Sequence, residues 1–195
     1  RLGERQDKRG QFPPMTGATK QAIILGSTRG LRRLDASQSM PLSLRPIGSV
    51  ETVLDWTLYS LNVQGVEHIT YIGGYQIQKV IEKHPSLNFR YHARWQQEGE
   101  LSAILTSDDL GEMDCYLLRS STLFFPEALN RLSGAENTIA TGFYIGEYGK
   151  EQLGLVSIPG FLLYPVMTLV TNLTDSSQLS SLEDLVEAIL ADGLP

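Results

Sequence analysis

The amino-acid sequence predicts an α/β fold built around a mostly parallel sheet. Short apolar runs of strand length alternate with longer segments in which apolar residues recur every three or four positions, the spacing of an amphipathic helix. The chain has 195 residues, of which 42% are hydrophobic, and this suits one domain with a substantial core. The sequence has no internal repeat. We therefore expect a flexible leader over residues 1–19 and one domain over residues 20–195.

The first half of the domain is expected to hold three strands and two helices. Gly65 and Pro85 follow the two helical segments, and both residue types commonly end a helix. In chain order we expect a strand at 21–25, a helix within 49–65, a strand at 68–72, a helix at 75–84 and a strand at 88–92. The first helix has one apolar face, which is formed by Val50, Val53, Leu54, Leu58 and Leu61.

The second half continues this pattern and adds two closing helices. Pro126 suits the first turn of a short helix, and Pro165 should kink or delimit the first closing helix. A capping box from Ser180 to Glu183 should open the last helix. The expected elements are a helix from Gly99 within 95–111, a strand at 115–119, a helix at 126–132, paired strands at 138–145 and 153–158, and helices at 161–173 and 181–193.

Charge is distributed unevenly along the chain. The net charge is −6, which argues against a general nucleic-acid-binding protein. Residues 1–45 nevertheless hold nine of the 16 Lys and Arg and three of the 22 Asp and Glu, so this segment is +6 and the remainder is −12. A cationic segment around a glycine-containing loop suits a small polyphosphate ligand.

Other features of the composition predict a cytoplasmic protein that spans no membrane. Cys115 is the single cysteine, so the chain forms no internal disulfide. No run approaches the ~18 consecutive apolar residues of a membrane span, and residues 1–14 are charged and polar. The histidines His68, His84 and His92 lack zinc-ligand spacing, and we expect them at the surface or at strand edges.

The segment from Ala22 to Gly48 carries the clearest functional signal. An apolar strand runs into the loop Gly26–Gly30, and three arginines, Arg29, Arg32 and Arg33, lie in or just after it. Ligands of parallel α/β sheets bind at the carboxyl ends of the strands. Glycine lets the backbone approach a phosphate closely, and the guanidinium group matches phosphate oxygens in pairs. The loop therefore predicts a phosphate-binding site.

A dinucleotide-binding site is an alternative that the sequence disfavours. The loop has two of the three glycines that the dinucleotide fingerprint requires. The second strand ends at Gly73-Gly74, where an acidic residue would be needed to bind the ribose. Tyr75 and Lys79 have the spacing of a dehydrogenase catalytic pair but come too early in the chain, so we expect them on a helix surface, with the tyrosine packed.

The longer pattern resembles the nucleotidyltransferases that join a nucleoside triphosphate to a sugar phosphate or alcohol phosphate, especially the small cytidylyltransferase-like branch. The family motifs L-A-A-G-x-G-x-R and P-K-x-L-x-P-v are matched by LGSTRGLR at 25–32 and PLSLRPIG at 41–48. Further motifs are matched in order at 54–75, 93–110 and 114–129. The resemblance implies a Rossmann-like three-layer α/β/α fold with a mostly parallel mixed sheet, and release of pyrophosphate during transfer.

The resemblance also implies roles for individual residues. Arg29 and Arg32 would be catalytic and hold the β- and γ-phosphates. The family uses Mg²⁺ bound to an aspartate, and that position falls on Ser121 here. The implied nucleotide-binding residues are Leu25, Gly26, Ser27, Thr28, Gly30, Gly99 and Ser102.

The departures from the family pattern bear directly on activity. Leu42 stands where the family has a lysine that steadies the phosphates, and Ser120-Ser121 replaces the Gly-Asp pair that holds the metal. A serine hydroxyl is a poor sole replacement for a carboxylate at a magnesium site. Arg45 is a candidate replacement for the missing lysine charge. The family also carries a second metal aspartate, which we expect beyond Pro195 in a longer protein.

Two functions therefore stay open. The first is an enzyme, most simply a CTP-dependent nucleotidyltransferase that acts on a small phosphorylated or phosphonylated alcohol. The second is a catalytically degenerate module that keeps the fold for nucleotide binding, regulation or assembly. A glycosyltransferase would need an Asp-x-Asp metal motif, which the sequence lacks. The expected ligands are a nucleoside triphosphate and a small phosphorylated acceptor, without nucleic acid; a fused domain or a second copy of the chain stays open as a protein partner.

Overall fold

Strands and helices alternate along most of the chain. The computed structural model describes residues 20–26, 40–49, 51–107, 110–135, 137–146, 149–176 and 181–195. Its strands are β1 (Lys20–Leu25), β2 (His68–Gly73), β3 (Asn88–Tyr91), β4 (Asp114–Arg119), β5 (Ala140–Gly146) and β6 (Gly149–Ile158). Its helices are α1 (Val53–Val63), α2 (Ile77–Lys83), α3 (Glu100–Ile104), α4 (Pro126–Ser133), α5 (Leu163–Ser176) and α6 (Leu182–Asp192), with the 3₁₀ turns η2 (Leu42–Leu44) and η3 (Gly160–Leu162).

A six-stranded mixed sheet forms the centre of the molecule, in the order β3-β2-β1-β4-β6-β5. The first four strands run parallel, because β1 pairs with β2 and β4, and β2 pairs with β3. β6 is antiparallel to β4, and β5 is antiparallel to β6. The predicted mostly parallel sheet and the pairing of the two strands before the closing helices are both confirmed.

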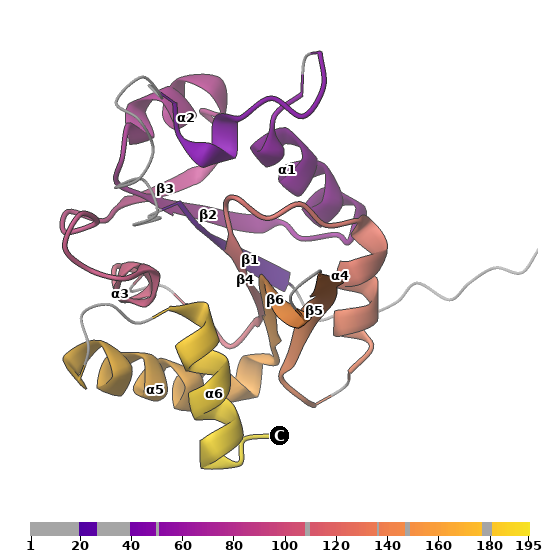
Figure 1. Cartoon of the computed structure of the whole chain (residues 1–195), viewed down its shortest axis with the longest axis vertical. Helices are drawn as coiled ribbons and strands as arrows, with labels where there is room; N and C mark the ends of the chain where they lie inside the picture. The colour runs from indigo at the N-terminus through magenta and orange to yellow at the C-terminus, as the bar shows by residue number, and fades with distance from the viewer. Residues whose placement is uncertain are drawn as a thin grey trace, which may run out of the picture.

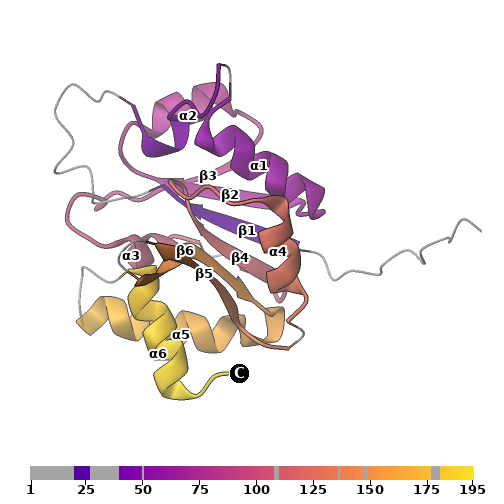
Figure 2. The ribbon, with the colours of Figure 1, turned by 45° about the vertical axis from the view of Figure 1, so that its right-hand side comes forward.

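Helices cover both faces of this sheet and complete a three-layer α/β/α arrangement. Figures 1 and 2 show α1, α2 and α4 on one face and α3, α5 and α6 on the other. Successive side chains of a strand point to opposite faces. In β1, Ile24 accordingly packs into the core beneath α1, whereas Ile23 and Leu25 pack into the core shared with α3, α5 and α6. The closing helices therefore share a hydrophobic core with the first strand.

The last helix begins one residue later than the predicted capping box requires. Ser181, and not Ser180, is the N-cap of α6; its hydroxyl accepts the Asp184 N–H, and the Asp184 carboxylate accepts the Ser181 N–H at 2.6 Å. Asp184 thereby takes the role predicted for Glu183. The correction matters because it frees the Glu183 carboxylate for a different contact.

Helix α3 is shorter than the sequence predicts. It spans Glu100–Ile104 and does not continue to residue 111. Thr106 explains the early end, because its hydroxyl and its N–H both donate to the Ala103 carbonyl, at 2.7 and 3.0 Å. Such local side-chain bonds compete with the helical ladder.

A small polar cluster joins the start of α1 to the end of α2. Asp55 accepts hydrogen bonds from Lys83 and Thr52, and these lower the pKa of its carboxyl to about 2 although burial acts in the opposite direction. Burial lowers the pKa of His84, and the charge of Asp55 opposes this only in part. Both folded-state pKa values lie below those of the unfolded chain.

The free energy of unfolding should therefore fall as the pH falls. In both cases the unfolded chain binds more protons than the folded chain. For His84 the loss of stability begins as the pH falls below the ordinary pKa of 6.5, and for Asp55 it occurs between about pH 4 and pH 2. We expect Asp55→Asn to make the loss between about pH 4 and pH 2 smaller, with the rest coming from other carboxyls of lowered pKa such as Glu98 and Glu183, and to cost about 1–2 kcal/mol at pH 7. Urea titrations at pH 7, 5 and 3 would measure this, with the exposed Glu67→Gln as the control. A wild-type-like loss below pH 4 in Asp55→Asn would contradict it.

Candidate functional site

The carboxyl ends of β1, β2 and β4 meet at one edge of the sheet. Leu25 lies opposite Arg119 in the β1–β4 register, and the Ser120 N–H donates to the Leu25 carbonyl at 2.9 Å. The Gly26 N–H donates to the Ile72 carbonyl at 2.7 Å. The N–H of Gly26 is therefore committed to the sheet, so any backbone donors of the predicted phosphate loop must come from residues after Gly26.

A buried tyrosine underlies the start of this loop. A Cβ atom at Gly26 would lie 2.3 Å from the hydroxyl oxygen of Tyr71, so the close approach of the ring requires glycine. The Tyr71 hydroxyl also lies 3.0 Å from the hydroxyl of Ser43 in η2, and burial raises its pKa. This contact holds the neighbouring Leu42, which is half-buried, near the edge where β1 ends.

The two serines after β4 occupy the predicted metal position. Ser120 is buried and Ser121 is exposed, immediately beyond the carboxyl end of β4. In the part of the chain that the structure describes, no three Asp, Glu, His or Cys side chains gather as a metal site. The two serine hydroxyls by themselves do not fit a protein-bound Mg²⁺, since that ion favours carboxylate oxygens. Asp114 lies at the opposite end of β4 and accepts the Gly160 N–H.

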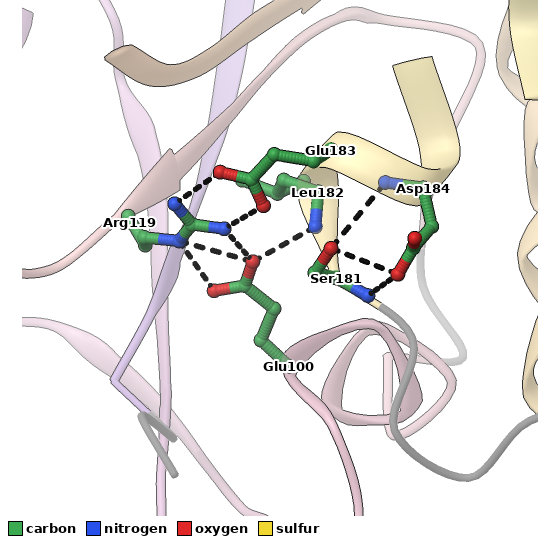
Figure 3. Close-up of polar contacts among 6 residues, drawn as sticks. All are labelled: Glu100, Arg119, Ser181, Leu182, Glu183 and Asp184. Atoms are coloured by element: carbon green, nitrogen blue, oxygen red, sulfur yellow. Dashed lines mark hydrogen bonds and ion pairs between the residues drawn. The ribbon is translucent and has the colours of Figure 1, made fainter. Parts of the chain in front are cut away.

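An arginine and two glutamates come together at the same edge. We call Arg119, Glu100 and Glu183 the Arg119 cluster. Figure 3 shows the guanidinium of Arg119 between the two carboxylates. Its Nε donates to Glu100 at 2.7 Å and its Nη1 to Glu183 at 2.7 Å, while Nη2 contacts both carboxylates. The cluster connects β4 to the first turns of α3 and α6.

The two glutamates of the Arg119 cluster differ in environment. The Glu100 side chain is 8% exposed and also accepts the Leu182 N–H at 2.8 Å, whereas the Glu183 side chain is 45% exposed. The hydrogen bond from Arg119 lowers the pKa of Glu183. Burial alone would lower the pKa of Arg119, but the bonds to both glutamates raise it. With one guanidinium and two carboxylates, the cluster has a formal net charge of one negative unit.

His92 is buried directly after the edge strand β3, so of the two expected positions, surface or strand edge, the surface one is wrong. Its side chain is 4% exposed, and its Nε2 atom lies 3.1 Å from both the Glu98 carboxylate and the Ser102 hydroxyl. Burial raises the pKa of the Glu98 carboxyl, but its hydrogen bond with His92 lowers it overall. This network fixes the turn that precedes α3. The lone histidine gave no spacing signal in the sequence, because its partners depend on how that turn folds.

Two of the predicted nucleotide-binding residues lie at this turn. Gly99 is the buried N-cap residue of α3, and the Ser102 hydroxyl donates to its carbonyl at 2.7 Å. Ser102 also lines a cleft of about 500 Å³, together with His92, Arg94 and Glu98. Of the remaining predicted residues, Leu25 is buried and Gly26 is half-buried. Ser27, Thr28, Arg29, Gly30 and Arg32 lie outside the described residues, so their roles stay predictions.

The dehydrogenase-like pair is divided between the turn after β2 and helix α2. Tyr75 precedes α2 and packs at a tilt against Trp95, with ring centroids 5.5 Å apart, and Lys79 lies within α2. Sequence reasoning missed the Arg119 cluster altogether. The signal that could have revealed it is Arg119 itself, a charged residue at the end of the apolar run of β4. Arg119 lies on the same face of the sheet as Leu117 and Ile23, which pack into the core.

Comparisons with known proteins establish the fold. No protein-family model and no curated protein match the sequence. Many solved structures are similar, including the following three. The inositol-1-phosphate CTP transferase from T. maritima has a TM-score of 0.68 at 17% identity, over 91% of this chain and 84% of that one. The CTP:phosphocholine cytidylyltransferase from Streptococcus pneumoniae has a TM-score of 0.64 at 12% identity, over 89% and 86%.

The third structure is a putative glucose-1-phosphate thymidylyltransferase from Bacillus anthracis, with a TM-score of 0.70 at 13% identity, over 90% of this chain and 85% of that one. All three are nucleotidyltransferases by name, so the resemblance read from the sequence motifs is confirmed at the level of the fold. Separately, no helix among the described residues has the length and apolar character to cross a membrane.

Proposed function

We propose that this chain binds a nucleoside triphosphate at the carboxyl edge of β1 and β4, and that it transfers the nucleotide weakly or not at all. The observation that carries the proposal is Ser121, which is exposed at the end of β4 where the family has a metal-binding aspartate. The fold supports nucleotide binding, and the cationic segment over residues 1–45 supports a polyphosphate ligand. Leu42 supports weak transfer, because it cannot neutralise phosphate charge.

A second candidate is a working transferase that uses CTP and a small phosphorylated alcohol. Two of the three similar structures are named for CTP transfer, and this favours CTP over the other nucleotides. The metal of such an enzyme would be Mg²⁺, with carboxylates supplied outside the described residues. Turnover at the ordinary enzyme rate of ~1–10³ s⁻¹ would select this candidate.

Nucleotide binding is the first testable consequence. We expect Arg29→Ala and Arg32→Ala each to weaken triphosphate binding by about 1–3 kcal/mol, the usual contribution of charged hydrogen bonds. Binding should also weaken as salt is added. Calorimetry with CTP, ATP, GTP, UTP and dTTP in the presence of Mg²⁺ would measure both effects. Arg131→Ala is the matched control, because Arg131 is exposed on α4. No detectable binding of any triphosphate at millimolar concentration would refute both candidates.

A further inference from the structure

We propose that Arg119 is a phosphate-binding residue of this site, and that the Glu183 carboxylate occupies the place of a phosphate group while the site is empty. The inference rests on the proposed nucleotide binding and adds to it a ligand-responsive contact between the site and helix α6. An anionic ligand would exchange with Glu183 on the guanidinium and loosen the first turn of α6.

The position of Arg119 supports a role in ligand binding. It is the last residue of β4 and lies opposite Leu25, so it stands one residue from Gly26 across the strand pair. Its side chain is 22% exposed, so it is partly accessible from solvent. The guanidinium already forms paired bonds with carboxylates, and the same fork geometry matches phosphate oxygens. Gly154 packs against its stem, since a Cβ atom there would lie 3.0 Å from the Arg119 Cβ.

The difference between the two glutamates identifies which one exchanges. Glu100 is nearly buried and accepts bonds from both Arg119 and the Leu182 N–H, so its release would leave a desolvated carboxylate without partners. Glu183 is half-exposed, and Arg119 is its side-chain partner in the cluster. Water can solvate the Glu183 carboxylate as it leaves. Glu100 alone neutralises Arg119, and the second carboxylate therefore adds negative charge where an anionic ligand would bind.

A matched pair of substitutions on α6 tests the exchange. Glu183→Gln removes the competing charge, whereas Glu187→Gln removes the same charge from an exposed position one turn further along the helix. Calorimetry with inorganic pyrophosphate and with CTP should show roughly tenfold tighter binding for Glu183→Gln. Glu187→Gln should stay within about twofold of wild type, because exposed charges are screened. Arg119→Lys, which keeps the charge but loses the fork, should weaken binding about tenfold.

The outcomes separate this inference from the proposed function. If the wild-type protein binds these ligands, and Glu183→Gln and Glu187→Gln bind them with equal affinity, the exchange is overturned and the proposed nucleotide binding is not. Absence of pyrophosphate and CTP binding in wild type and in all variants would overturn both. Tighter binding by Glu183→Gln together with weaker binding by Arg119→Lys supports the exchange. Thermal melts of each variant would establish that it is folded before binding is measured.

Discussion

The double substitution Leu42→Lys with Ser121→Asp should raise the rate of pyrophosphate release by about 10²-fold or more, the scale of one transition-state stabiliser. Lysine would supply the missing positive charge beside the phosphates, and aspartate would supply the missing metal ligand. Each single substitution should do less, because groups that act as a unit are not additive. Both positions can accept the new side chains, since Leu42 is half-buried and Ser121 is exposed.

The assay would follow pyrophosphate release from CTP and other triphosphates with Mg²⁺ and a panel of acceptors, namely inositol phosphate, phosphocholine and glucose 1-phosphate. The uncharged double variant Leu42→Met with Ser121→Asn is the control, because it approximates the shapes without the charges. Equal rates for the charged and uncharged variants would refute the assignment of these two positions. Wild-type turnover near ~1–10³ s⁻¹ would show instead that the site is complete through other residues.

Removal of Arg119 should cause the largest loss of stability among the site variants. Arg119→Met leaves the nearly buried Glu100 carboxylate with the Leu182 N–H as its remaining partner. Breaking a buried ion pair in this way costs about 3–5 kcal/mol. The additional change Glu100→Gln should restore part of the loss, because it removes the unpaired charge while keeping a similar shape.

Urea denaturation of the full chain would measure these differences. The exposed Arg131→Met should change the free energy of unfolding by less than about 0.5 kcal/mol and serves as the control for the loss of an arginine. A cost below about 1 kcal/mol for Arg119→Met, the range of surface ion pairs, would mean that the cluster is solvated rather than buried. If Glu100→Gln recovers no stability when it is added to Arg119→Met, the loss comes instead from the packing of the arginine stem against Gly154.

Local sequence patterns predicted the elements better than their ends. The apolar run of β1, the helix around Leu54 and the late paired strands were all recognisable, because burial on one face repeats with the period of the element. The shortened α3 was not predicted, since its end depends on the hydrogen bonds of Thr106 to one carbonyl. The start of α6 was displaced by one residue because two serines and two acids compete for the same capping geometry.

The sequence by itself determined the α/β architecture, while the phosphate-binding role of Gly26–Gly30 and the loss of lysine and aspartate at Leu42 and Ser121 stay predictions. The architecture could be read because the elements are local, so their order and spacing along the chain are sufficient. The tertiary structure alone decided the burial of His92 and the Arg119 cluster, whose glutamates lie 19 and 64 residues from the arginine. The physical reason is that an ion pair forms where strand register and helix docking bring side chains together. The apolar periodicity of a single segment predicts neither the register nor the docking.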